Sequence, residues 1–196
     1  MSRYAIIACG VFKDEIEEIA DDLGFPARVR YLEAGLHVDF DGLAEALKRE
    51  LEDCRGFDGI IVAFGECHPR IAEILAPYNA VLLRCQNCID ALITRKKVEE
   101  IANRGLYFYL SPGWVKGWRD MFERMSWSQE EARFQLAPFK GAIFLDTLGN
   151  AQDYEEGLIE FLDFTLCPYE KMPVDLAHFR ALILEAKERC DLGRGA

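Results

Sequence analysis

The cysteines are the residues of this sequence most able to do chemistry, and three of them fall in two short stretches. FGECHP occupies residues 64–69 and RCQNCID occupies residues 84–90. The first places Cys67 before a histidine, and the second holds Cys85 and Cys88 as a Cys-x-x-Cys. Thiolate and imidazole groups are typical zinc ligands, whereas a Cys-x-x-Cys also serves as a redox pair. The two stretches therefore predict either a metal centre or a reactive dithiol.

Cysteine is frequent in the whole chain, with seven among 196 residues. The N-terminal stretch MSRYAIIACGVFKDE has a short apolar run that soon turns acidic, and it lacks the length and cleavage site of a signal peptide. We therefore expect a cytoplasmic protein, in which thiols stay reduced. Free thiols, metal ligands or catalytic groups are then the expected roles of the cysteines, and the odd count agrees with this.

Charge and hydrophobicity exclude several function classes. The formal net charge of -11 argues against nucleic acid as a partner, because binding phosphates needs clustered Lys and Arg. It also argues against an anionic membrane surface, and no stretch approaches the roughly 20 continuous apolar residues of a membrane span. Neither the dinucleotide motif G-x-G-x-x-G nor the P-loop motif G-x-x-x-x-G-K-[ST] occurs, so nucleotide binding has no basis in the sequence.

Short apolar runs alternate with amphipathic stretches, which predicts one α/β domain over residues 1–196. We expect a mainly parallel, doubly wound, Rossmann-like sheet with helices on both faces. Strands are predicted over residues 4–9, 27–33, 58–65, 80–84, 106–110 and 141–146. Helices are predicted over residues 12–23, 40–51, 89–102, 114–125, 129–137, 154–164 and 175–190.

Several of the chemically competent residues follow the predicted strands. Cys9 ends the first strand, and His37 lies in the connection after the second. Cys67 follows the third strand, and Cys85 and Cys88 follow the fourth. Ligands of open α/β sheets bind outside the carboxyl ends of the strands. One cysteine at a strand end is usually a packing residue, but this recurrence predicts a shared site with zinc as the expected metal.

The remaining cysteines provide a contrast. Cys54, Cys167 and Cys190 fall at or near helix ends with no sign of convergence, and we expect each to be a small buried apolar residue. The redox interpretation of the Cys-x-x-Cys ranks second. A thioredoxin-like pair needs no further cysteine, and the Gln86-Asn87 spacer has no proline or aromatic residue.

Three further residues are candidates for roles at this edge of the sheet. Glu66 is the one carboxylate inside FGECHP, and we assign it as a general base, a ligand or a group that supports a ligand. Trp114, in the stretch SPGWVKGW, is expected to line a pocket or to belong to a lid, although packing in the core explains it equally well. Asp146 ends the sixth strand and is expected either to face a bound cofactor or to cap a helix.

Short motifs spread over most of the chain carry a family resemblance. They are IIACGVFKDEI at the N-terminus, GLH at residues 35–37, FGECH, the Cys88-Ile89 pair and PGW at residues 112–114. With these motifs the sequence resembles a domain-of-unknown-function family of small cysteine-containing α/β proteins. Members of that family are often encoded near corrinoid-dependent methyltransferases in anaerobic bacteria and archaea.

The resemblance implies Cys9, His37, Cys67 and Cys88 as a recurrent polar set. This chain departs from the family pattern at His68, where a glycine is usual, and before Cys88, where a His-Asp is common. Cys85 is then either a local substitute ligand or a residue without a role. The resemblance also implies a corrinoid protein or methyltransferase as partner and thiol or methyl-group transfer as the chemistry. The alternatives are an iron–sulfur accessory protein and a partner-binding module braced by a structural metal.

Overall fold

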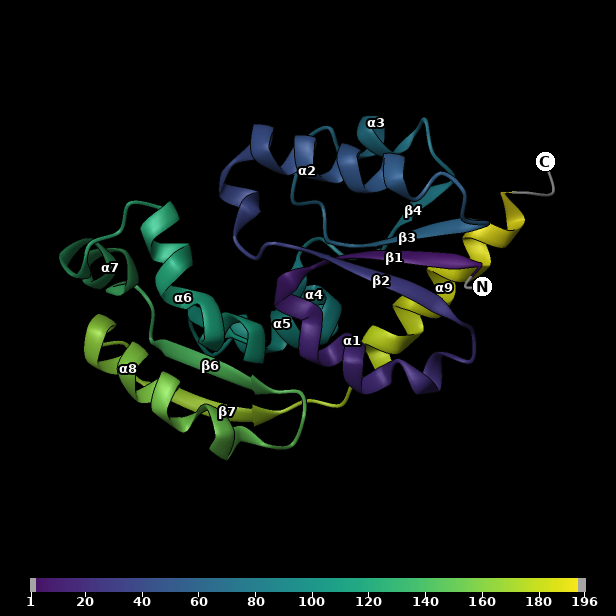
Figure 1. Ribbon diagram of the computed structural model, residues 1–196. Coiled ribbons are helices and arrows are strands. Elements are labelled where there is room, and N and C mark those ends of the chain that lie inside the picture. Colours follow the sequence, from purple (N-terminus) through teal and green to yellow (C-terminus); the bar gives the residue numbers. More distant parts are fainter. Residues whose placement is uncertain (1–2, 194–196) are drawn as a thin grey trace.

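The strands form two parallel sheets, as expected for an α/β fold of Rossmann-like, doubly wound character (Figure 1). The structure is a computed structural model that describes residues 3–193. The first sheet has the order β2-β1-β3-β4 and the second the order β5-β6-β7, and every pairing is parallel. The strands are β1 (Tyr4–Cys9), β2 (Ala27–Leu32), β3 (Gly59–Ala63), β4 (Ala80–Leu82), β5 (Tyr107–Leu110), β6 (Gly141–Asp146) and β7 (Tyr169–Pro173).

Helices cover both faces of the first sheet. The longer helices and helical turns are α1 (Lys13–Ile19), α2 (Phe40–Asp53), α3 (Ile71–Leu75), α4 (Cys88–Leu92), α5 (Arg95–Ala102), α6 (Pro112–Arg124), α7 (Gln129–Leu136), α8 (Glu155–Thr165) and α9 (Ala177–Leu192). The 3-10 turns of residues 3–193 are η1 (Gly10–Phe12), η2 (Asp21–Leu23), η3 (Leu36–Val38) and η4 (Ala151–Tyr154). In residues 3–193 no helix is long and apolar enough to cross a lipid bilayer.

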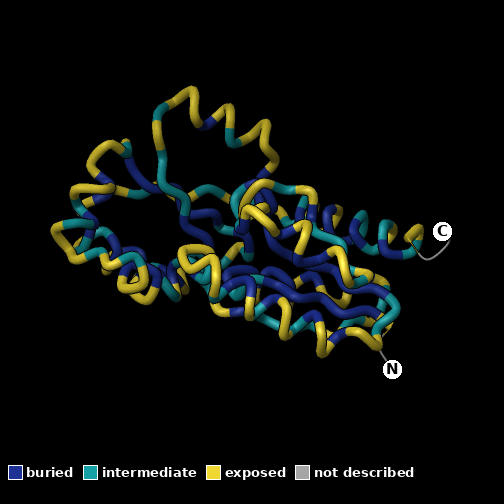
Figure 2. The backbone as a smooth tube through the Cα atoms, turned by 90° about the horizontal axis from the view of Figure 1, so that it is seen from above, coloured by how far each residue is buried: buried dark blue, intermediate teal, exposed yellow. Residues whose placement is uncertain are grey.

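Three hydrophobic clusters give the molecule its layers. One face of the first sheet packs on α2 and α3, and Ile7, Val62 and Leu47 belong to this buried cluster. The other face packs on α1, α4 and α9, and Ile143 of β6 belongs to this same cluster, so these helices lie between the two sheets. The outer face of the second sheet packs on α6, α7 and α8. Figure 2 shows the buried strands inside this shell of more exposed segments.

The first sheet contains a topological switch point. The chain leaves β1 to form β2 on one side, and it leaves β3 to form β4 on the other side. β1 and β3 are direct neighbours, with Tyr4 beside Gly59 and Ala8 beside Ala63. Ligands of doubly wound sheets bind where neighbouring strands send their connections in opposite directions. The connections that follow Cys9 and Ala63 therefore border the favoured place for a site.

Some sequence predictions differ from the structure. The strands of the described residues are divided between two sheets, because helices fill the space between β1–β4 and β5–β7. The seventh strand, β7, was not predicted, since Glu170 and Lys171 are exposed on this edge strand and its sequence is not apolar. The predicted helix 89–102 is two helices, because the Thr94 side chain accepts the Lys97 N–H and starts α5 anew.

Candidate functional site

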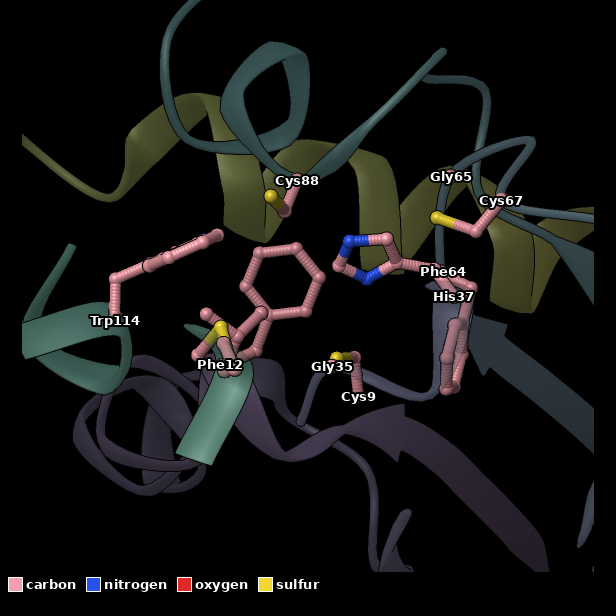
Figure 3. A pocket seen from close by; sticks show the side chains of 11 residues that line it. Cys9, Phe12, Gly35, His37, Phe64, Gly65, Cys67, Cys88 and Trp114 are labelled. Atoms are coloured by element: carbon pink, nitrogen blue, oxygen red, sulfur yellow. The ribbon is translucent and has the colours of Figure 1, made fainter. Parts of the chain in front are cut away.

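One small pocket at the carboxyl edge of the first sheet is lined by four of the predicted ligands (Figure 3). Cys9 comes from the end of β1, and His37 comes from η3 after β2. Cys67 comes from the loop after β3, and Cys88 is the first residue of α4 after β4. Four separate connections thus deliver three thiols and one imidazole to the same space, which we call the inner pocket.

The rest of the inner pocket is apolar. In residues 3–193, no Lys, Arg, Asp or Glu side chain lines it. Its free volume is about 30 Å³, which is room for a metal ion or for one or two water-sized groups. Figure 3 shows Trp114 on the side away from Cys67. The remaining lining residues are Val11, Phe12, Gly35, Phe64, Gly65 and Met121.

A close backbone contact holds the two cysteine-bearing stretches together. A Cβ atom on Gly65 would lie 2.5 Å from the Cα atom of Asn87, which is too close for any side chain. Beside this contact, the Glu66 N–H donates to the Gln86 carbonyl at 2.9 Å. The Asn87 side chain accepts two N–H groups of α4 and thereby fixes the first turn, which carries Cys88.

A second close contact brings α6 against the end of β1. A Cβ atom on Gly113 would lie 2.3 Å from the Val11 carbonyl oxygen, so only glycine fits at this position. Helix α6 starts here, with the Ser111 side chain accepting the Trp114 N–H at 3.4 Å. Because α6 is anchored at this point, it can supply Trp114 and Met121 to the inner pocket.

Burial keeps the thiols of the inner pocket protonated. Desolvation raises the pKa of Cys9 to about 11, and it also raises the pKa of Cys67 and of Cys88. Each thiolate would in addition repel the others, since charges on Cys9 and Cys67 further raise the pKa of Cys88. A thioredoxin-like cysteine has a lowered pKa instead. These thiols therefore need a cation nearby to ionise at neutral pH.

His37 stands at the edge of the pocket, where desolvation favours the neutral form of its ring. Its outer side is exposed, while desolvation of the ring lowers the pKa of the imidazole. A neutral imidazole keeps a lone pair on one ring nitrogen, and this is the form that binds metals. The side chain is thus chemically suited to complete a set of three thiolates.

Cys85 faces a different space from Cys88. It lines a larger, more open pocket together with Glu66, Asp90 and His178, while Cys88 lines the inner pocket. The Cys85 thiol donates to the Phe64 carbonyl at 3.6 Å, and burial is the largest cause that raises its pKa to about 12. The two cysteines of the Cys-x-x-Cys therefore line different pockets.

Comparison with known families assigns the chain. A family described as a protein of unknown function, DUF1638, matches residues 31–183. The chain belongs to this family. The matched range includes His37, Cys67, Cys85 and Cys88 of this DUF1638 protein, and it leaves out Cys9. Neither the curated proteins nor the solved structures that were compared with the chain gave a match.

The other candidate residues of this DUF1638 chain occupy distinct places. Trp114 lines the inner pocket and packs edge-on against Phe108, with ring centroids 5.4 Å apart. Glu66 is exposed and lines the larger pocket. The Asp146 side chain accepts the Asn150 N–H at 3.1 Å and so caps a turn, and it does not line the inner pocket. As expected, the cysteines outside the site are buried, namely Cys54, Cys167 and Cys190.

Met121 is a pocket residue that the sequence analysis missed. Its side chain is 3% exposed and brings a further soft sulfur to the inner pocket. Met121 follows Trp114 by seven residues, and residues seven apart lie on one face of a helix. This spacing was the available signal, because it puts both side chains on the face of α6 that meets the pocket.

The ligating groups border the inner pocket without being assembled into a metal site. Over residues 3–193, no three or more His, Cys, Asp or Glu side chains lie close enough together to hold a metal ion as they stand. The backbone contacts at Gly65 and Gly113 fix the loops, so closure of the set would depend mainly on side-chain movement. The arrangement is thus a convergence of soft donors around a small space.

Proposed function

We propose that this protein binds one zinc ion in the inner pocket through the thiolates of Cys9, Cys67 and Cys88, with His37 as the fourth ligand. One observation carries this proposal. Side chains from four separate strand connections, all of them zinc-binding types, line one small pocket beside the switch point of the first sheet. A random distribution of seven cysteines gives no reason for such a convergence.

The chemistry of the donors supports the same assignment. Buried neutral thiols release their protons when a divalent cation binds, because the cation offsets the charge that the apolar surroundings disfavour. Three thiolates and one neutral imidazole form a common tetrahedral zinc set, with zinc–sulfur distances of about 2.3 Å. Binding would therefore draw the side chains inward from their present positions and release protons to solvent.

The apolar side of the pocket suggests what the metal does. Trp114, Met121 and Phe12 face the donors and offer no charge to a ligand. We propose that a small thiol or a methyl-bearing group enters from this side and takes the position of His37, the most exposed of the four donors. A zinc ion with one replaceable ligand acts as a Lewis acid and activates the group that takes that ligand's place. The family resemblance extends this to methyl transfer in the cytoplasm, with a corrinoid protein or methyltransferase as partner.

An iron–sulfur cluster is the second candidate, and the geometry favours it less. Clusters are typically held by four thiolates. In the described part of the chain, Cys85 is the nearest candidate for a fourth thiol, but it lines the other pocket. The inner pocket, with a free volume of about 30 Å³, suits a single ion better than a cluster.

Metal analysis of anaerobically purified protein tests the proposal. We expect about one zinc per chain, and at most a trace in Cys67→Ala and Cys88→Ala. Cys54→Ala is the matched control, since Cys54 is buried away from the pocket, and it should retain the metal. Iron with acid-labile sulfide would favour the cluster instead. Metal-free protein with a Cys85–Cys88 disulfide would overturn both and support a redox pair.

A second measurement separates an activating centre from a structural brace. The zinc is replaced by Co²⁺, whose visible spectrum reports its ligands, and ethanethiol is added. If ethanethiol can replace one ligand of the bound Co²⁺, the cobalt–thiolate absorbance should rise with ethanethiol concentration. In His37→Ala, the same rise should occur at lower ethanethiol concentrations. A spectrum that ethanethiol leaves unchanged in both proteins would show a closed structural site.

A further inference from the structure

Soft sulfur atoms and aromatic rings surround the inner pocket. Three cysteines and Met121 bring the sulfur, and the rings are those of Phe12, Phe64 and Trp114. Sulfur is polarizable and makes favourable contacts with aromatic rings, so these walls suit a neutral group of carbon and sulfur. The free volume of about 30 Å³ holds one or two water-sized groups. Methanethiol, with one carbon and one sulfur atom, has this size and this chemistry.

We propose that Trp114 sets the size limit of the inner pocket, so that the pocket accepts a methyl group bound to sulfur and excludes a longer carbon chain. The inference rests on the proposed function, in which a small thiol or a methyl-bearing group enters the pocket. It goes further by naming the residue that selects among such groups. The indole ring selects by the space it occupies at the end of the pocket opposite Cys67 (Figure 3).

The Trp114 ring is held in place from outside the pocket. It packs edge-on against Phe108 of β5, with ring centroids 5.4 Å apart, which is a favoured arrangement of aromatic rings. Phe108 in turn contacts Phe139 and Phe161, at centroid distances of 5.8 and 6.0 Å. The backbone is fixed too, because Gly113 lies directly against the backbone that follows β1. To admit a larger group, the ring would have to give up these contacts.

The other large apolar lining residues are poorer candidates for this role. Phe12 is fully buried and packs on Phe179, with ring centroids 4.9 Å apart, so it belongs to the core between the two sheets. Met121 is buried as well, and its unbranched side chain can adapt its shape to a ligand. Trp114 is half-buried, so shortening it would widen the pocket with the least disturbance of the core.

Ligand affinity should therefore depend on the length of the carbon chain and on Trp114 together. In the wild type we expect 1-butanethiol to bind at least about ten-fold more weakly than methanethiol, since an apolar pocket discriminates by about that factor for each methylene it cannot hold. In Trp114→Ala, 1-butanethiol should bind at least about ten-fold more tightly than in the wild type, because the missing indole leaves room to bury the chain. Methanethiol should gain nothing. Trp114→Phe keeps a ring beside Phe108 and should lie between the two, and it supplies the comparison if Trp114→Ala does not fold.

Methyl NMR of zinc-free protein measures these affinities. The full-length chain is labelled with carbon-13 at its methionine methyl groups and titrated anaerobically with each thiol. The Met121 signal, identified by its absence in Met121→Leu, reports on the inner pocket. Trp127→Ala is the matched control, since Trp127 is also half-buried but packs on Phe122 and does not line the pocket. It should bind both thiols as the wild type does.

The outcomes separate the size limit from the zinc centre. The size limit is wrong if methanethiol leaves the wild-type Met121 signal unchanged, or if both thiols bind the wild type equally well. It is also wrong if 1-butanethiol binds the two Trp114 variants no more tightly than the wild type. A gain in Trp127→Ala as large as that in Trp114→Ala would overturn it as well, by showing a general loosening of the fold. These titrations contain no metal, so a lack of zinc in the purified protein would overturn the proposed function without changing the affinities.

Discussion

Single residues decide which side chains reach the inner pocket. Cys9, Cys67 and Cys88 could be predicted as a group, because a residue that follows a buried parallel strand lies at the same edge as its counterparts. The separation of Cys85 from Cys88 into two pockets could not be predicted in this way. It depends on how Asn87 caps α4 and turns the loop, and strand patterns carry no information about the side on which a loop residue faces. Met121 was missed because methionine was not counted among the ligating residues.

Gly65 gives a sharp test at this scale. In Gly65→Ala, the new Cβ atom would meet the Asn87 backbone at 2.5 Å, and this would force the two cysteine-bearing loops apart. We expect a loss of about 1–3 kcal/mol of unfolding free energy and at least a ten-fold loss of zinc affinity. Urea unfolding of the zinc-free protein and competition with a chromophoric chelator measure the two effects. Gly56→Ala is the control, since a Cβ atom there meets nothing within 4 Å. Equal affinities in the two variants would contradict this.

The ends of helices and strands could be predicted where the hydrophobic pattern is strong. They could not be predicted where a side-chain cap ends one helix and starts another. The predicted strands 4–9 and 141–146 match β1 and β6, because both are buried on both faces. The break between α4 and α5 depends on Thr94, and the β7 edge strand has too few apolar residues to be recognised. The assignment of strands to two sheets depends on long-range packing, which local sequence patterns do not record.

The cap of α4 is the element on which the site most depends. The Asn87 side chain accepts the N–H groups of Ile89 at 2.9 Å and Asp90 at 3.0 Å. We expect Asn87→Ala to lower the unfolding free energy by about 1 kcal/mol, as for other lost N-caps. Zinc affinity should fall as well, because the first turn of α4 carries Cys88. Asn87→Asp keeps an acceptor oxygen and should restore both quantities in urea unfolding and zinc titration. A failure of aspartate to restore them would show that the amide, and not the cap, matters.

At the scale of the whole molecule, one buried carboxyl lies where the two sheets approach each other. Glu15 of α1 is fully buried, and its Oε1 atom accepts the Thr147 hydroxyl at 2.9 Å, just after β6. Its Oε2 atom has no hydrogen-bond partner in the described residues. Burial is the main cause that raises the pKa of Glu15 to about 7; the hydrogen bonds from its own backbone and from Thr147 oppose this rise more than Lys116 of α6 does. The folded protein thus holds this proton up to neutral pH.

This raised pKa predicts that folding stability falls as the pH rises. The unfolded chain loses the Glu15 proton near pH 4.5, whereas the folded chain keeps it to about pH 7. Unfolding free energy should therefore decrease between these two values, by up to about 3 kcal/mol, and stay lower above pH 7. Glu15→Gln cannot ionise, so it should be more stable than the wild type at pH 8, and this advantage should be much smaller at pH 5, where only a small part of the loss has occurred. Urea unfolding of zinc-free protein at both values measures this, with the exposed Glu17→Gln as the control on the same helix. A Glu15→Gln advantage of the same size at both pH values would show that Glu15 does not titrate in this range.

The expected result would make Glu15 a proton-sensitive contact between α1 and the second sheet. Helix α1 directly follows Val11 and Phe12, which line the inner pocket.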